Sequence, residues 1–274
     1  MIPALAFLYG AVIGSFLNVC ILRLPQGESV VSPRSRCPRC KNAIAPYDNI
    51  PIFSWLILGG RCRGCREPIS PLYPMVEFAT GLLFLVAILQ HGLSWEFAKM
   101  TVFSALLVVL VVTDWRERIL PDKVNFPGIA IGVLFSLVVP VGDGAGAFLV
   151  RLSGIDPLPV AAISLLDALL GALAGGGLLY LIGELYYLLR HQEGMGFGDV
   201  KMMAMVGVFL GPKLTLFTIF MASVIGALAG GLFLLVSKKE SNYELPFGTF
   251  LGFSAWVAPY GGIRVLNWYL GLFP

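Results

Sequence analysis

Long apolar stretches alternate with short polar and basic segments along the whole chain. A helix that crosses a membrane needs about 20 mostly apolar residues, and the first stretch, Ile2–Leu22, carries no charge until Arg23. This stretch is too long for a cleaved signal peptide and lacks its basic start. We therefore interpret it as a retained membrane helix.

Seven further apolar segments follow, so the pattern predicts an all-α integral membrane protein with about eight spans. The sixth of the eight spans, Val200–Leu210, has eleven residues and would reach roughly 17 Å, which is short of a hydrocarbon core of about 30 Å. It either extends through Gly211 and Pro212 or borders a water-filled cavity. The seven segments are Tyr73–Leu89, Phe97–Thr113, Val124–Val141, Ser164–Leu189, Val200–Leu210, Leu214–Val236 and Phe247–Leu272.

Composition and the distribution of positive charge support this topology. The chain is 57% hydrophobic and 13% charged, whereas soluble domains carry about 25% charged residues. Fifteen of the nineteen Lys and Arg residues lie in the loops after spans one, three, five and seven. The positive-inside rule places these loops in the cytoplasm and both termini outside. The net charge of +3 then reflects loops beside anionic lipid, and we expect no nucleic-acid binding.

Two aspartates stand at the cytoplasmic ends of predicted spans. Asp114 ends the third span, and Asp199 opens the sixth. A carboxylate at a membrane edge is costly to place and commonly marks function. Two carboxylates from different segments can share one water molecule and one proton, as in aspartic proteases. We expect Asp114 and Asp199 to be a catalytic pair, although Asp199 also suits a helix N-cap.

Glycines alternate immediately before the second aspartate, at Gly194, Gly196 and Gly198. Such a strip has no side-chain bulk on one edge and would admit an extended peptide beside the Asp199 carboxylate. Gly196 and Gly198 are therefore candidate substrate-binding residues.

Other acidic residues near the spans have simpler explanations. Asp122 precedes an apolar run and suits an N-cap. Glu77 lies near the start of the second span, where a carboxylate favours the helix N-terminus. Asp167 and Glu184 are expected to be buried hydrogen-bond partners or interface residues.

Other catalytic classes are hard to build from this chain. Its two histidines, His91 and His191, fall on opposite sides of the predicted membrane. A two-histidine metal site is therefore excluded, and only His191 remains for a cytoplasmic triad. No phosphate-binding glycine loop of the Walker type is present.

The largest predicted cytoplasmic loop carries two Cys-x-x-Cys pairs, Cys37/Cys40 and Cys62/Cys65, with 21 residues between them. This spacing is typical of a tetrahedral Zn²⁺ site, and with four thiolates no ligand position stays open for catalysis. Two disulfides or free thiols are the alternatives, but a reducing cytoplasm disfavours disulfides. A structural zinc would stabilise a loop too small to bury much core. Cys20 is expected to be a packing residue.

With these motifs in view, nearly the whole chain resembles the bacterial type IV prepilin peptidases, which are bifunctional leader peptidases and N-methyltransferases. The G-x-G-D element alone is also similar to that of presenilin-type intramembrane aspartyl proteases. The resemblance rests on Gly14–Val19, Arg23–Pro25, both cysteine pairs, Asn49–Pro51, Ser54–Trp55, Ile69–Ser70, Tyr73–Pro74, Glu77, Asp114, Leu120–Asp122 and Gly196–Lys201.

The resemblance implies an inner-membrane enzyme in which Asp114 and Asp199 cleave the short basic leader of prepilins and type II secretion pseudopilins. The new N-terminal residue would then be methylated from S-adenosylmethionine. No nucleotide-binding glycine loop is present, so the methyl-donor site is unknown, with Glu77 and Asn18 as weak candidates. The implied organisation is a first membrane helix over 1–22, a methylation-associated cytoplasmic zinc loop over 23–72, and a polytopic aspartyl peptidase core over 73–274.

Three alternatives use the same residues differently. A transporter would use Asp114, Asp167, Glu184 and Asp199 as a proton relay, but the two best-placed acids lie at one face and no inverted repeat is visible. A membrane scaffold that docks through its zinc loop leaves the glycine-rich segment before Asp199 unexplained. The third alternative is a peptidase that does not methylate. Loss of the cysteine pairs would have indicated it, but both pairs are intact.

Overall fold

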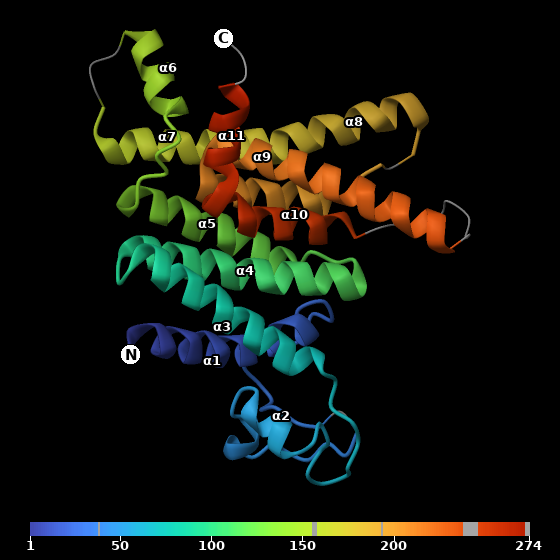
Figure 1. Cartoon of the computed structure of the whole chain (residues 1–274). Helices are drawn as coiled ribbons and strands as arrows, with labels where there is room; N and C mark the ends of the chain where they lie inside the picture. Colours follow the sequence, from blue (N-terminus) through green and yellow to red (C-terminus); the bar gives the residue numbers. More distant parts are fainter. Residues whose placement is uncertain (38, 155–157, 193, 238–245, 272–274) are drawn as a thin grey trace. The chain divides into compact units, whose positions relative to one another are not determined.

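The structure is a computed structural model that describes residues 1–37, 39–154, 158–192, 194–237 and 246–271 (Figure 1). Its secondary structure is helical, and the described residues contain two isolated β-bridges but no strand. The chain divides into two compact units, Met1–Val109 and Leu110–Pro274. Each unit is described by itself below.

The helices follow the apolar runs of the sequence. Short π-helical turns join α7 to α8 and α10 to α11, at Leu173–Gly177 (η2) and Ala258–Gly262 (η3). A 3₁₀ turn, η1, covers Pro46–Asn49. The α-helices are α1 (Ile2–Arg23), α2 (Phe53–Ile57), α3 (Leu72–His91), α4 (Trp95–Glu117), α5 (Asp122–Val138), α6 (Ala145–Ser153), α7 (Val160–Ala172), α8 (Leu178–Arg190), α9 (Phe197–Ser237), α10 (Phe247–Val257) and α11 (Ile263–Leu270).

The all-helical membrane class is confirmed, but the count of eight spans is not. Five helical segments within the described ranges are long and apolar enough to cross a membrane. Among the predicted segments, α5 is only 17 residues long, and the eighth is broken by η3. The predicted end of that eighth segment, Leu272, lies outside the described residues. The five are Ile2–Arg23, Leu72–His91, Trp95–Glu117, Val160–Arg190 and Phe197–Phe233.

In the first unit, α1 and α3 run side by side because glycines remove side-chain bulk between them (Figure 1). A Cβ atom on Gly10 would lie 2.8 Å from Cβ of Phe84, and one on Gly14 would lie 2.7 Å from Cα of Glu77. These glycines are four residues apart, so they occupy one face of α1. Small residues at this spacing let membrane helices approach closely. This contact brings the Glu77 region of α3 against α1.

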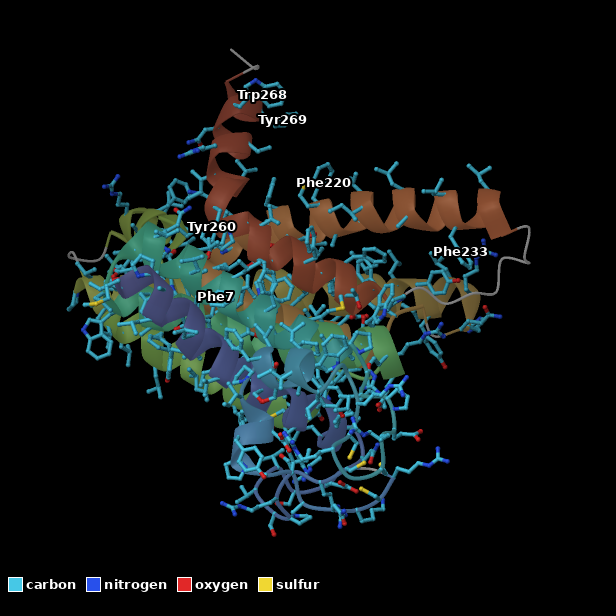
Figure 2. The ribbon with its side chains drawn as sticks, turned by 60° about the horizontal axis from the view of Figure 1, so that its bottom comes forward. Phe7, Phe220, Phe233, Tyr260, Trp268 and Tyr269 are labelled. Carbon is cyan, nitrogen blue, oxygen red and sulfur yellow. The ribbon has the colours of Figure 1, made fainter. Side chains whose placement is uncertain are left out.

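The outer faces of the helices carry large apolar side chains, as lipid contact requires. Figure 2 shows Phe220 on α9 and Trp268 and Tyr269 on α11 pointing away from their helices, and all three are exposed. Phe7, in contrast, packs edge-on against Phe78 at 5.7 Å between ring centroids. Exposed apolar surface of this extent fits a protein embedded in a bilayer.

In the second unit, α7 and the first part of α9 pack backbone against backbone. Gly171 and Gly207 face each other so closely that a Cβ on either would collide with the carbonyl group of the other. One turn further, a Cβ on Gly175 would meet the carbonyl oxygen of Met203. Gly171 and Gly175 therefore form the small-residue face along which the helix that carries Asp199 is held.

Helix α9 reverses direction at Gly211. The backbone there is not helical (φ 78°, ψ 171°), and Pro212 follows. At one end of the helix pair, Gly248 of α10 approaches Asp199 while Phe247 lies near Gly226. The two parts of α9 before and after Gly211 are therefore antiparallel. The short sixth segment does not continue as a straight helix through Gly211 and Pro212, so the first of its two expected forms is wrong.

The loop before α6 braces this reversal. The Asp143 carboxylate accepts a hydrogen bond from the backbone N–H of Lys213 (3.0 Å), and the Lys213 ammonium donates to the Asp143 carbonyl oxygen (2.6 Å). Burial raises the pKa of Asp143, although the Lys213 N–H bond and charge oppose that rise. Asp167 accepts from the Gly146 N–H at 2.6 Å, which confirms it as a buried hydrogen-bond partner.

The glycine contact gives the first testable prediction. Gly207→Ala should destabilise the protein by more than about 3 kcal/mol, because the new methyl group meets backbone atoms that cannot rotate away. Gly231→Ala is the matched control, since nothing lies within 4 Å of a Cβ at that position and alanine favours a helix over glycine by up to about 1 kcal/mol. Thermal unfolding in detergent measures both variants, and equal unfolding temperatures would contradict the proposed contact.

Candidate functional site

Asp114 lies on α4 one turn from its end, and its side chain is buried at 5% exposure. Its Oδ2 atom accepts two hydrogen bonds from one residue of α10: the backbone N–H of Thr249 donates at 2.6 Å and the Thr249 hydroxyl donates at 2.8 Å. The first N–H groups of a helix have no partner within that helix. The start of α10 therefore satisfies a buried carboxylate with donors that are free for this role.

Asp199 sits in the first turn of α9 and is also buried, at 8% exposure. Its backbone N–H bonds to the carbonyl oxygen of Gly196 at 3.0 Å. Its Oδ1 atom is buried without a hydrogen-bond partner among the described residues. Buried polar atoms are normally hydrogen-bonded, so this carboxylate oxygen is free to bond a molecule that enters the site.

Gly248, at the start of α10, lies between the two carboxylates. A Cβ built on Gly248 would lie 2.9 Å from Asp199 Oδ1 and 3.1 Å from Asp114 Oδ2. These two oxygens are therefore no further apart than the sum of the two distances. The structure thus brings Asp114 and Asp199, 85 residues apart in the chain, into one site.

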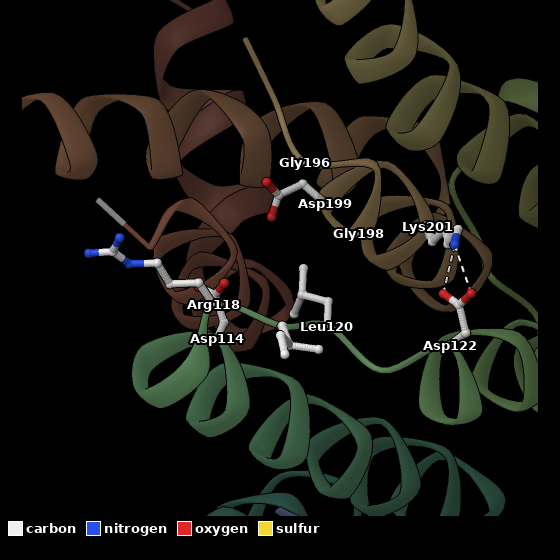
Figure 3. Close-up of a pocket in the computed structure, with 9 residues that line it drawn as sticks. Asp114, Arg118, Leu120, Asp122, Gly196, Gly198, Asp199 and Lys201 are labelled. Atoms are coloured by element: carbon white, nitrogen blue, oxygen red, sulfur yellow. Dashed lines mark hydrogen bonds and ion pairs between the residues drawn. The ribbon is translucent and has the colours of Figure 1, made fainter. Parts of the chain in front are cut away.

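A cavity of about 270 Å³ opens beside this pair, as Figure 3 shows. In this view Asp199 lies above Asp114, and Leu120 lies to one side of the pair. The cavity is large enough for several backbone atoms of a peptide and a water molecule. Its lining consists of Asp114, Arg118, Ile119, Leu120, Asp122, Gly196, Gly198, Asp199 and Lys201.

The predicted glycines occupy different surroundings. Gly196 and Gly198 line the cavity, and a Cβ on Gly198 would approach Leu120 at 3.0 Å. Gly194 instead packs against the ring of Tyr186, which a Cβ would overlap. Gly198 belongs to the first turn of α9, whereas Gly196 lies in the loop before that helix.

An ion pair closes one side of the cavity. The Lys201 ammonium lies 2.7 Å and 2.8 Å from the two carboxylate oxygens of Asp122, and it also sits over the rings of Phe126 and Phe197. Asp122 was expected to cap α5, but the N-cap is Pro121 and no side-chain cap bond forms. Its carboxylate pairs with Lys201 instead, because Lys201 lies in the second turn of α9 across the cavity.

The four loop cysteines converge in the first unit. Their Sγ atoms all lie within 4.8 Å of one another, and those of Cys37 and Cys65 are 3.8 Å apart. Four thiolates at about 2.3 Å around a tetrahedral Zn²⁺ would lie about 3.8 Å from one another. All five cysteines of the chain are thiols, so no disulfide competes with this arrangement. The cluster therefore fits a zinc ion.

The two Cys-x-x-Cys turns repeat one backbone geometry. In the first, Lys41 N–H bonds to the Cys37 carbonyl, and Arg36 bridges to Ala43. In the second, Arg66 N–H bonds to the Cys62 carbonyl, and Arg61 bridges to Pro68. Lys41 (φ 61°) and Arg66 (φ 60°) both adopt the left-handed conformation. The residue pattern alone did not reveal this short internal repeat.

The pKa values of Cys37 and Cys65 are shifted in opposite directions. A hydrogen bond with the backbone of Cys40 is the main cause that lowers the pKa of Cys37 to about 7. A hydrogen bond with the backbone of Glu67 lowers the pKa of Cys65, but burial and bonds with the other three thiols raise it to about 11. Four thiols this close resist joint ionisation, which a divalent cation would overcome.

Glu77 joins the cysteine loop to α3, and Asn18 joins α1 to the start of α3. Glu77 Oε2 accepts a hydrogen bond from the backbone N–H of Ile52 at 2.7 Å, and the Asn18 amide donates to the Tyr73 carbonyl at 3.1 Å. Ile52 has φ 64°, which is rare for a β-branched residue. Both polar side chains are buried.

Gly248 and Thr249 are not among the site residues predicted from the sequence. The available signal was a glycine and a threonine directly after Pro246 at the start of an apolar run, on the same predicted face as both aspartates. Such a signal is common at helix starts, so only the fold gives it meaning.

Fold and site together define a class: a multi-pass, all-helical membrane protein with two carboxylates buried at one cavity and a separate four-cysteine cluster. Comparison with known families matches residues 8–91 to the Bacterial Peptidase A24 N-terminal domain and residues 101–231 to the Type IV leader peptidase family. The chain therefore belongs to the type IV leader peptidase family and is an enzyme.

Curated relatives agree over most of the chain. It is 35% identical to the prepilin leader peptidase/N-methyltransferase of Aeromonas hydrophila, over 97% of this chain and 93% of that protein. It is 38% identical to the protein of that name in Myxococcus xanthus (strain DK1622), over 88% and 68%, and 32% identical to that of Pseudomonas aeruginosa, over 96% and 91%. No solved structure gives a significant match.

The cysteine cluster leads to a prediction about metal content. Cys37→Ser should reduce zinc from about one ion per chain to none, because three thiolates and a hydroxyl hold Zn²⁺ far more weakly than four thiolates. Cys20→Ala, at a buried cysteine of α1 outside the cluster, should keep the ion. Elemental analysis of the purified proteins measures both variants, and a wild-type protein without zinc would contradict the assignment.

Proposed function

We propose that the protein cleaves the short basic leader from type IV prepilins and type II secretion pseudopilins with Asp114 and Asp199, and N-methylates the new N-terminal residue from S-adenosylmethionine. One observation carries the cleavage step: two buried carboxylates meet beside Gly248 at a cavity that glycines line. The family match and the names of the curated relatives support the substrate class and the second activity.

Cleavage follows from what two carboxylates at one cavity can do. Two such groups close together favour one shared proton. A water molecule between them gives a proton to the ionised carboxylate as its oxygen attacks the scissile carbonyl carbon. The protonated partner gives its proton to the carbonyl oxygen. When the tetrahedral intermediate collapses, the C–N bond breaks and the leaving nitrogen takes a proton from the pair.

The cavity also suits a peptide in an extended form. Gly196 and Gly198 present backbone without side chains on its lining, so a substrate strand can approach Asp199 closely. The substrate's apolar helix would stay in lipid, while its leader enters at the cavity. The Lys201–Asp122 pair, with Asp122 half exposed (53%), lies where it can contact that leader.

We place the active site and the zinc loop on the cytoplasmic face of the bacterial inner membrane. Fifteen of the nineteen basic residues fall on that side of the predicted topology. The implied division is a first membrane helix at 1–22, a zinc loop at 23–72 and a peptidase core at 73–274.

Zinc and the methyl donor belong to the second activity. Cys37, Cys40, Cys62 and Cys65 would hold one structural Zn²⁺, which would fix the loop that the resemblance associates with methylation. S-adenosylmethionine enters as a substrate whose binding residues stay unassigned. Glu77 and Asn18 are the candidates, since both are buried polar residues of α1 and α3 that contact or border this loop.

The transporter alternative loses its relay. Asp167 accepts a hydrogen bond from Gly146 N–H, and Glu184 is exposed on α8, so neither continues a path from the Asp114–Asp199 pair. The scaffold alternative does not account for the orphaned oxygen of Asp199.

The catalytic pair gives a direct test. Asp114→Asn and Asp199→Asn should each lower cleavage of a co-expressed prepilin by about 100-fold or more, because each removes an acid–base group. Glu184→Gln, an exposed acid on α8 of the same unit, should cleave like wild type. Mass spectrometry of the prepilin reports loss of the leader and gain of one methyl group. Cleavage at wild-type rate in either aspartate variant would rule out the pair.

A further inference from the structure

The start of α10 approaches both catalytic carboxylates, and it belongs to none of the sequence motifs described above. Thr249 donates two hydrogen bonds to Asp114 Oδ2, one from its backbone N–H and one from its hydroxyl. Gly248, its neighbour, approaches Asp114 and Asp199 together. Gly248 and Thr249, in the first turn of α10, therefore belong to the site together with the two aspartates.

The two aspartates are held very differently. Asp114 Oδ2 is bound by an N–H at 2.6 Å and a hydroxyl at 2.8 Å. The hydroxyl's other contact, the Val111 carbonyl, is longer at 3.4 Å, so its single proton goes to the carboxylate. Asp199 Oδ1 has no partner among the described residues and is over nine-tenths buried. One carboxylate is clamped, and the other is left to bond a reacting molecule.

Gly248 makes this arrangement sterically possible. A Cβ there would lie 2.9 Å from Asp199 Oδ1, 3.0 Å from Asp114 Cγ and 3.1 Å from Asp114 Oδ2. Real Cβ atoms rarely approach that closely, and both carboxylates would have to turn away. The conformation of Gly248 is ordinary helix, so the requirement for glycine is one of space and not of backbone dihedral angle.

We propose that Thr249 is a positioning residue that clamps Asp114 in its reactive orientation, and that Gly248 keeps open the space in which Asp114 and Asp199 meet. This inference rests on the proposed peptidase function and extends it from two aspartates to a third segment of the chain. Thr249 acts through Asp114 and does not itself touch the substrate.

The hydroxyl is tested by a matched pair of variants, with purified protein in detergent and a synthetic prepilin peptide. Thr249→Val keeps size and shape but removes the hydroxyl donor, and it should lower kcat by about 10- to 100-fold with KM within about twofold. Thr249→Ser keeps the hydroxyl and should recover kcat to within about threefold of wild type.

Thr218→Val is the control for loss of a buried threonine hydroxyl. Thr218 lies on α9 of the same unit, and its hydroxyl donates to the Leu214 carbonyl of its own helix, so kcat should stay within about twofold. Wild-type kcat in Thr249→Val would overturn the inference. Equal losses in the Ser and Val variants would overturn it too, because the hydroxyl would then not be the active feature.

Gly248→Ala tests the space between the carboxylates and should lower kcat by at least about 100-fold. Gly261→Ala, at a glycine of η3 with nothing within 4 Å of a Cβ, should behave like wild type. Full activity of a folded Gly248→Ala protein overturns this half of the inference, and unfolding temperatures identify a protein that has not folded.

Asp114→Asn and Asp199→Asn in the same assay distinguish failure of the proposed peptidase function from failure of the positioning role. Cleavage at wild-type rate by either aspartate variant means that the proposed function fails, whatever the Thr249 variants do. Two inactive aspartate variants beside a fully active Thr249→Val mean that only the positioning role fails.

Discussion

The second unit is organised around the need to bury two carboxylates without leaving both unsatisfied. A carboxylate removed from water requires hydrogen bonds or a partner charge, and a helix interior offers neither because its N–H groups are already bonded. The unit meets this need at helix ends. Asp114 near the end of α4 meets the open donors at the start of α10, and Asp199 stands in the first turn of α9. A bundle of uninterrupted helices would have no such donors at that depth.

Glycines supply the second constraint, which is distance. The first part of α9 lies against α7 through Gly171 and Gly207 and approaches the start of α10 at Gly248. In lipid, helix association depends on close packing and not on the hydrophobic effect. The same small residues that hold α9 in place therefore also set how near Asp199 comes to Asp114. Stability and site geometry share their cause.

The sequence predicted what depends on residue type and spacing. The helical membrane class and the convergence of four cysteines followed from apolar run length and from Cys-x-x-Cys chemistry, and the structure confirms both. It also predicted that Asp114 and Asp199 meet, because both fall on one face of the topology, and they do.

What the sequence could not reveal depends on chain reversals and on contacts between distant segments. Gly211–Pro212 reads as a helix interruption, but only the structure shows that α9 returns on itself there. The two antiparallel parts of α9 correspond to the predicted sixth and seventh segments, whereas the count of eight was not confirmed because α5 is only 17 residues long and η3 breaks the last segment. Asp122 suited an N-cap by position, and its pairing with Lys201, 79 residues away, has no local signature.

The reversal of α9 also explains why the sixth segment is so short. A straight helix of full membrane length that began at Asp199 would cross the whole bilayer, and the two membrane surfaces would fix the positions of both its ends. The part Phe197–Leu210 ends at Gly211, where Asp143 and Lys213 brace the turn, and the longer second part runs back beside it. The position of Asp199 is therefore set by packing against α7 and α10 and not by membrane thickness. This freedom lets a buried carboxylate sit at the cavity while the helix that bears it remains packed inside the unit.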